Sequence, residues 1–212
     1  MKTAIILFLA ISLVSYRENN SNSNGSCATN QGYDCWPTNQ QSDQDSLTWL
    51  KDLRDFRTAV AAADKNKVKR FFDLPLMNEH NEIWHLVYEG NRQELNRLSE
   101  KIKPFTAQDL DKHFHKLFPK KFITTILKLK LDELAKKGES ETIKFKDGSS
   151  STYSMYASVD RTAGTVTLAL GMQTVLKNEK GAIEGNEEYG TLYIFSIMPD
   201  GHLKFKGIGQ SA

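Results

Sequence analysis

The sequence predicts an α+β domain in which helices come first and an antiparallel sheet follows. Between residues 46 and 137, apolar residues recur every three or four positions, which is the period of an amphipathic helix. From residue 143 onward they recur at every second position, the period of a strand with one buried face. Turn residues separate the alternating runs, so we expect N-terminal helices packed on a bent sheet of four to five strands.

The first two helices are predicted by spacing and by a polar start. From residue 46 the apolar positions follow steps of four, three and four: Trp49, Leu53, Phe56 and Val60. Asp64 begins a second, short helix, which Pro75 ends because proline cannot continue a helix. The charged side chains between them form the solvated face, while the apolar residues of this stretch enter the core.

The middle of the chain predicts three further helical segments. Residues 83–88 and 95–102 keep the helical period, and the pair Thr106 and Asp109 is typical of a capping box that starts another helix. A last helix is expected from Pro119, at its first position, to a stop at Gly138. Its apolar residues are Phe122, Ile123, Ile126, Leu127, Leu131 and Leu134.

Alternation then predicts strands at residues 143–146, 153–159 and 165–172. Two further strands, 189–198 and 203–208, are predicted on either side of the hairpin turn Pro199-Asp200-Gly201. The run 189–198 is apolar on both faces, so we expect it in the interior of the sheet with helices over one side. Residues 177–188 are predicted to form the longest loop, which ends in acidic residues. This loop is either a binding loop or lid, or a variable connection without function.

The N-terminus has the pattern of an export signal. Lys2 precedes an apolar run at residues 4–14, which is too short for the roughly 20 residues that a membrane span of about 30 Å requires. We therefore predict a signal peptide over residues 1–15, cleaved after Ser15. The mature protein is then expected in the periplasm or secreted, with no membrane segment left after signal cleavage.

Residues 16–44 form a polar leader, and residues 45–212 are predicted to form a single domain. Cys27 and Cys35 flank a seven-residue polar segment of this leader, ATNQGYD. In an oxidising compartment two nearby thiols favour pairing, so we expect a Cys27–Cys35 disulfide that staples the leader locally.

Several functional classes are disfavoured by composition and by missing motifs. The chain has 28 basic and 26 acidic residues, a net charge of +2, which is poor evidence for a nucleic-acid partner. No Gly-x-Ser-x-Gly, phosphate-binding Gly-rich loop or His-Glu-x-x-His is present, and we expect no cofactor and no catalytic residue. His113 and His115 are two positions apart on a predicted helix, about 200° around its axis, so we expect no metal site. Ion pairs with Asp109 and Asp111 are expected there instead.

Two segments carry a resemblance to a known family. FRTAVAAADKNKVKRFFDLPL, residues 56–76, and YGTLYIFSIMPDGHLKFKGIG, residues 189–209, resemble the opening and the last hairpin of NTF2-like domains (nuclear transport factor 2-like, the cystatin-like cone) of exported bacterial proteins. The resemblance implies a bent antiparallel sheet wrapped round a long N-terminal helix, enclosing a conical cavity. The same analogy allows a homodimer that forms through the sheets of two copies. No reaction is implied, since this fold hosts enzymes, carriers and interaction modules.

Aromatic residues supply the candidate ligand-binding site. Trp84, His85 and Tyr88 lie together on a predicted helix, while Tyr153 and Tyr193 lie on strands. A cavity lined by such rings would suit a small ligand, and packing in the core is the competing interpretation. His85 is the histidine that we would choose for acid–base work.

These observations favour an exported, non-catalytic NTF2-like domain that binds a small apolar ligand or a protein partner. One alternative is a periplasmic inhibitor or immunity protein for a secreted toxin, for which the acidic loop 177–188 would be the contact. The other is a weak hydrolase or isomerase of the NTF2-like fold, which requires a buried catalytic group such as His85.

Overall fold

The computed structural model describes residues 41–77, 80–98, 102–148 and 150–211, all within one compact unit, residues 39–212. The predicted signal peptide and the cysteines Cys27 and Cys35 lie outside the described residues. Within them, no helix is both long and apolar enough to cross a membrane.

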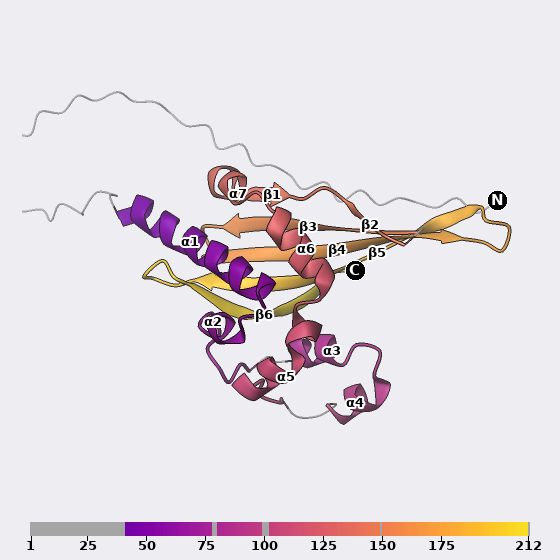
Figure 1. Cartoon of the computed structure of the whole chain (residues 1–212), viewed down its shortest axis with the longest axis horizontal. Coiled ribbons are helices and arrows are strands. Elements are labelled where there is room, and N and C mark those ends of the chain that lie inside the picture. Colours follow the sequence, from indigo (N-terminus) through magenta and orange to yellow (C-terminus); the bar gives the residue numbers. More distant parts are fainter. Residues whose placement is uncertain (1–40, 78–79, 99–101, 149, 212) are drawn as a thin grey trace, which may run out of the picture. The chain divides into compact units, whose positions relative to one another are not determined.

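Seven helices and six strands form in the described part of the chain, which confirms the α+β class (Figure 1). The long first helix begins at Gln41, before the composition change that the sequence suggested as its start. The helices are α1 (Gln41–Ala61), α2 (Lys65–Lys69), α3 (Glu82–Val87), α4 (Arg92–Arg97), α5 (Ala107–Leu117), α6 (Lys120–Lys128) and α7 (Leu131–Lys137).

Three helix ends form as the local sequence predicts. Asp64 precedes α2 and its carboxylate accepts from the Lys67 amide at 3.1 Å. Before α5, the Thr106 hydroxyl accepts from the Asp109 amide at 3.3 Å, and the Asp109 carboxylate accepts from the Thr106 amide at 3.0 Å. Gly138 ends α7 with a φ of 81°, which glycine adopts without strain. The capping box and the glycine stop are therefore confirmed.

The single helix predicted from Pro119 to Gly138 is wrong, because the structure has two helices there. α6 ends at Lys128 and Leu129 is extended, with φ −64° and ψ 132°. Leu129 and Leu131 are both buried, and in one helix they would point about 200° apart. The break lets both leucines enter the core, and the Arg57 guanidinium donates to the Leu129 carbonyl at 3.3 Å. Leu127, one of the apolar residues of this segment, is 47% exposed.

The strands make one antiparallel sheet in the order β1-β3-β4-β5-β6, with β2 paired to a second part of β3. In the described residues there are six strands rather than four or five, because β1 carries one buried serine between two glutamates and shows no apolar alternation. The predicted interior strand is β5, which lies between β4 and β6. The bounds are β1 (Glu139–Glu141), β2 (Phe145–Asp147), β3 (Ser151–Asp160), β4 (Thr165–Lys177), β5 (Ile183–Ile197) and β6 (Leu203–Ser211).

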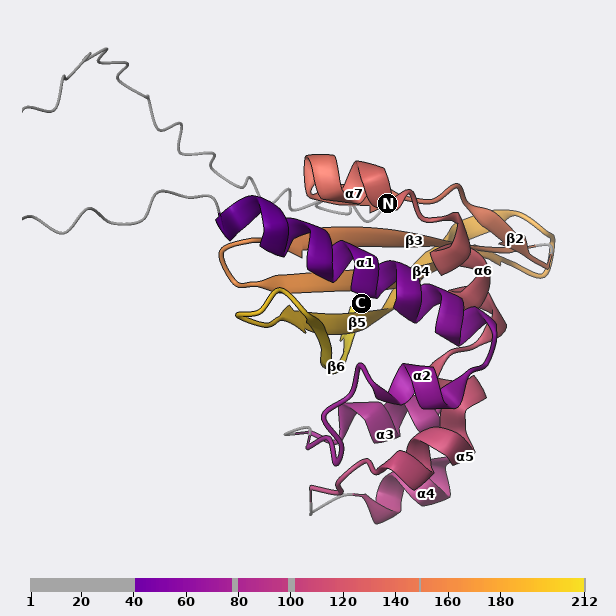
Figure 2. The ribbon, with the colours of Figure 1, turned by 60° about the vertical axis from the view of Figure 1, so that its left-hand side comes forward.

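The long loop predicted at residues 177–188 is wrong as well. β4 continues to Lys177 and β5 begins at Ile183, so the connection is short and the two strands form a projecting hairpin. Its residues pair across the two strands, for example Gln173 with Glu188, with one register shift between Leu176 and Lys177. Both ribbon views show the hairpin extending past the helices (Figures 1 and 2). A two-stranded ribbon exposed on both faces needs no apolar alternation, so its strands escaped the sequence pattern.

Helices α1, α6 and α7 lie over one face of the sheet, while α2 to α5 lie beyond the β6 edge (Figure 2). Phe56 of α1 is central to the core, because its ring meets those of Phe71, Phe118 and Phe195 edge-on, with centroids 5.0–5.7 Å apart. The β6 edge is partly covered, since the Phe205 amide donates to the Phe71 carbonyl at 2.6 Å.

Candidate functional site

A pocket of about 690 Å³ opens where the α5–α6 junction faces the sheet, and we call it the α5–α6 pocket. This volume is within the range of about 300–1,000 Å³ that is usual for small-molecule sites. The helical side contributes Leu86, His115, Lys116, Lys120 and Lys121. The strands β4 and β5 contribute Leu170, Met172, Tyr189, Thr191 and Tyr193.

The pocket exists because the chain stops one helix and starts another over the sheet. α5 ends at Leu117, and Pro119 takes an extended conformation, with φ −68° and ψ 163°, before α6 begins at Lys120. Proline cannot donate to a helix, and it also disfavours a helical conformation in the residue before it. The break therefore brings lysines from the end of α5 and the start of α6 to one opening.

The base of the pocket is apolar and rigid. Leu170 is 6% exposed and Tyr193 is fully buried. The Tyr193 hydroxyl donates to the Leu117 carbonyl at 2.8 Å, and its ring packs against Phe118 and Phe122. Burial raises the pKa of Tyr193 above its usual range, and the nearby negative charge of Glu89 adds to this effect. Tyr193 is thus an uncharged residue of the pocket base, and its hydroxyl is already bonded to the Leu117 carbonyl.

The mouth of the pocket is basic. Lys116 and Lys120 are exposed, and neither has a carboxylate partner among the residues that the structure describes. Lys121 is engaged, since its ammonium group pairs with Asp147 and lies 3.4 Å from the Met172 sulfur. Glu89 is the acidic residue that lines this part of the described chain. An anionic group would therefore be attracted to the opening.

Three of the predicted site residues lie elsewhere, and two of them, Trp84 and Tyr88, serve packing. Trp84 is fully buried, its ring stacks on Tyr88 at 5.4 Å, and its Nε1 donates to the Lys103 carbonyl at 2.8 Å. The Lys103 ammonium lies 3.7 Å from the centre of the Trp84 ring, a close cation–π contact. His85 on the same helix is exposed and does not line the α5–α6 pocket.

The two predicted strand tyrosines line two neighbouring spaces. Tyr193 lines the α5–α6 pocket, and Tyr153 lines an adjoining shallow hollow of about 300 Å³. Met172 and Tyr189 border both spaces. Tyr153 also stacks on Phe145, with ring centroids 5.4 Å apart. Of the five predicted residues, therefore, the pocket itself includes only Tyr193.

The two histidines of α5 differ from the prediction in their partners. Asp109 is used in the capping box, and Asp111 accepts from the Lys69 ammonium at 2.7 Å, so the expected pairs with His113 and His115 do not form. His113 packs edge-on against Trp84 at 5.9 Å, and burial lowers its pKa. Among the described residues no group of three or more metal-binding side chains comes together.

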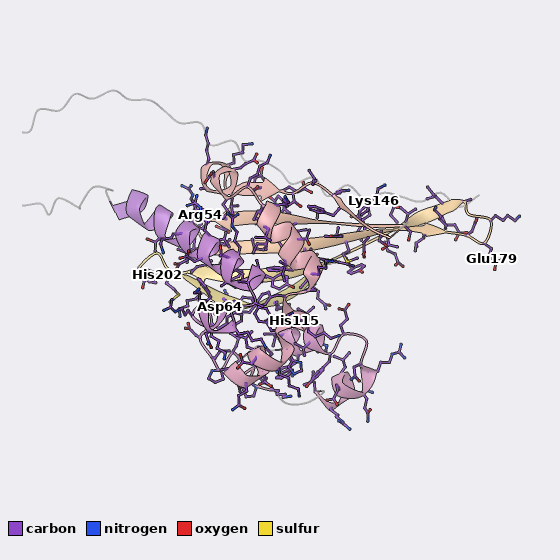
Figure 3. All side chains as sticks on the ribbon, viewed as in Figure 1. Arg54, Asp64, His115, Lys146, Glu179 and His202 are labelled. Carbon is purple, nitrogen blue, oxygen red and sulfur yellow. The ribbon has the colours of Figure 1, made fainter. Side chains whose placement is uncertain are left out.

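Sequence reasoning missed both the mouth of the pocket and a histidine–carboxylate pair. The proline between Lys116 and Lys120 is the sequence signal that these two lysines flank a break between helices. His202, labelled in Figure 3, bonds through Nδ1 to the Asp52 carboxylate at 2.9 Å. The two residues are 150 positions apart in the sequence, so no local pattern reveals this pair.

Comparisons with protein-family models, with curated proteins and with solved structures found no match for this chain. Function must therefore be argued from the geometry and charge of the pocket itself.

Proposed function

We propose that this protein is a non-catalytic binding domain that holds a small ligand in the α5–α6 pocket, with an apolar body at the base and an anionic end at the mouth. The observation that carries the proposal is the contrast within one pocket. Buried Leu170 and Tyr193 form its base, whereas Lys116 and Lys120 stand at its opening without carboxylate partners in the described chain. Such a site should bind an amphipathic anion more tightly than a wholly apolar ligand.

The fold that we assume for this proposal is the NTF2-like cone, and export of the domain is part of it. The long helix α1 lying across an antiparallel sheet supports the first assumption. The apolar run after Lys2 supports the second. Catalysis is disfavoured because His85 is exposed and the Tyr193 hydroxyl is engaged.

The test is a calorimetric titration of the full chain with decanoate and with the neutral analogue 1-decanol. We expect decanoate to bind at least about tenfold more tightly. The double variant Lys116→Gln/Lys120→Gln should weaken decanoate binding about tenfold, because each partly exposed ion pair contributes up to about 1 kcal/mol. Decanol binding should not change in this variant.

A matched control removes the same charge elsewhere. Lys112 and Lys128 are exposed and do not line the pocket. The variant Lys112→Gln/Lys128→Gln should therefore bind decanoate as the wild type does. Equal affinity for decanoate and decanol, or an equal loss in both double variants, would refute the proposal.

A protein partner is a second candidate, favoured by the projecting β4–β5 hairpin. Leu176 is 38% and Ile183 is 70% exposed there, next to Glu184 and Glu187. Exposed apolar residues with acidic neighbours suit a basic partner, as an inhibitor of a secreted toxin would require. The variant Leu176→Ser/Ile183→Ser should abolish partner co-purification while decanoate binding is retained. Unchanged co-purification would exclude this surface.

A further inference from the structure

A second cleft, of about 620 Å³, opens between α1, α2 and the β5–β6 turn, and we call it the α1–α2 cleft. It shares no lining residue with the α5–α6 pocket. Its apolar surface comes from Ala59, Ala62 and Phe71. Figure 3 labels two of its polar residues, Asp64 and His202.

The position of His202 is fixed by contacts of Asp52 with its ring and with the next backbone amide. The Asp52 carboxylate accepts from the Leu203 amide at 3.0 Å and lies 2.9 Å from the Nδ1 atom of His202. The Asp52 side chain is only 15% exposed, whereas that of His202 is 58% exposed. The Nδ1 atom is engaged by Asp52, whereas Nε2 has no partner in the described residues. Nε2 is therefore the ring atom that is available to a ligand. The hydrogen bond to Asp52 raises the pKa of His202, which favours the form that donates from Nε2.

Arg70 is the cation of the cleft that no carboxylate neutralises. Its side chain is exposed, and within the described chain its guanidinium has neither an ion pair nor a hydrogen bond. The backbone beside it is fixed, because Lys204 donates to the Arg70 carbonyl at 3.2 Å and to Asp73 at 2.9 Å. A guanidinium group presents a planar set of donors that binds oxyanions in a bidentate way.

Two lysines of the cleft form ion pairs that are exposed to solvent. Lys51 lies 2.9 Å from Asp55 on α1, and Lys67 lies 3.0 Å from Asp64 beside α2. The Lys51 side chain is 73% exposed and that of Lys67 is 67% exposed. Exposed pairs of this kind contribute little stability, so either ammonium group can turn to a bound anion at small cost.

We propose that the α1–α2 cleft binds the phosphoryl group of a small organic phosphate. Donors reach the cleft from three sides: Lys51 on α1, Lys67 and Arg70 at α2, and His202 at the turn. A tetrahedral oxyanion can accept from all three sides at once, whereas a planar carboxylate would use mainly the Arg70 fork. The apolar surface at Phe71 then contacts the organic part of the ligand.

The test is a titration of the full chain with phenyl phosphate, followed by calorimetry and by the phosphorus NMR shift. Benzoate, which has the same ring and a planar anion, is the comparison probe, and it should bind at least about fivefold more weakly. The variant Arg70→Gln should lose at least about tenfold in affinity for phenyl phosphate, as expected for a bidentate charged contact. His202→Gln should lose about threefold, because one donor is removed.

Arg92→Gln is the matched control, since Arg92 is exposed on α4 and does not line the cleft. It should bind phenyl phosphate as the wild type does. The proposal is overturned if Arg70→Gln and Arg92→Gln bind equally, or if benzoate binds as tightly as phenyl phosphate. It is also overturned if Lys116→Gln/Lys120→Gln weakens phenyl phosphate binding and Arg70→Gln does not, because the ligand would then occupy the α5–α6 pocket.

Discussion

Replacing Tyr193 with phenylalanine should lower the free energy of unfolding by about 1–2 kcal/mol, although only one oxygen atom is removed. The Tyr193 hydroxyl donates to the Leu117 carbonyl at 2.8 Å, and both residues are fully buried. Leu117 is the last residue of α5, so its carbonyl has no partner within the helix. Leaving a buried acceptor unsatisfied costs about 1–3 kcal/mol. The lower part of that range applies because the ring contacts remain.

The assay is urea unfolding of the full chain, followed by tryptophan fluorescence, with thermal unfolding as a second measurement. For a domain of this size, about 1 kcal/mol corresponds to a change of about 2–4 °C in the midpoint. Tyr189→Phe is the matched control in the same strand. The Tyr189 hydroxyl is 3.5 Å from the Met172 sulfur and the residue is 50% exposed, so its loss should change stability by less than about 0.5 kcal/mol.

The comparison of these two variants decides whether the hydrogen bond holds the end of α5 on the sheet. If Tyr193→Phe and Tyr189→Phe lower stability equally, with the same dependence on urea concentration, the reasoning is wrong. A changed urea dependence in Tyr193→Phe alone would instead indicate an altered unfolded or native state, and the two free energies could not be compared.

Three further changes test the core, a helix end and the histidine pair. Phe56→Leu should lower the free energy of unfolding by about 1.5–3 kcal/mol in urea titrations, since it loses edge-on contacts with three phenylalanine rings at 5.0–5.7 Å; a loss below about 0.5 kcal/mol would contradict this. Gly138→Ala should lower the free energy of unfolding by about 1 kcal/mol, because a φ of 81° strains an L-residue. Gly185→Ala, at a strand position with open space around it, should leave the stability unchanged. Equal urea midpoints for the two variants would show that the left-handed conformation of Gly138 does not require glycine. The pKa of His202 is raised by Asp52, so the pair stabilises the fold below the unfolded histidine pKa of about 6.5, and this contribution is lost as pH rises through the folded value. The difference in midpoint between wild type and His202→Gln should therefore shrink from pH 5.5 to pH 8.5, and a constant difference would argue against the pairing.

The elements that could be predicted from the sequence are those specified by neighbours in the chain. The buried face of α1 follows its three-and-four spacing, and all four predicted residues, Trp49 to Val60, are buried. The capping box at Thr106 and the glycine end at Gly138 are likewise local, because each is satisfied within a few residues. Strands β3 and β6 and the first part of β4 alternate, since one of their faces meets the helices.

The elements that escaped prediction depend on distant partners or on no burial at all. The break at Leu129 lets two leucines enter a core built by other segments, and Arg57, 72 positions away, donates to the freed carbonyl. The β4–β5 hairpin is stabilised by backbone pairing beyond the helical layer, so it leaves no apolar alternation in the sequence. Local pattern cannot report either cause.

The candidate sites escaped prediction for the same reason. Trp84 and Tyr88, four apart on a helix, are compatible in sequence with a pocket wall and with a packed stack. The contacts of Trp84 with the Lys103 carbonyl and ammonium group decide for packing. Asp52 on α1 and His202 at the β5–β6 turn meet only when α1 packs against the sheet. Residue types alone could not bring them together.

The two proposed sites should act independently, and this follows from how the sheet joins them. Tyr193 lies at the α5–α6 pocket and Leu203 at the α1–α2 cleft, and both belong to the paired strands β5 and β6, where they are buried and fixed by main-chain bonds. No lining residue is shared. Coupling between sites requires an element with two arrangements that both ligands bias, and this strand pair, whose register shifts once between Ile194 and Phe195, shows a single arrangement. Saturating phenyl phosphate should therefore change the decanoate affinity of the full chain by less than about twofold, which is within about 0.4 kcal/mol. A larger shift in calorimetric titrations would show that the strand pair moves, and would refute the rigid sheet assumed for both sites.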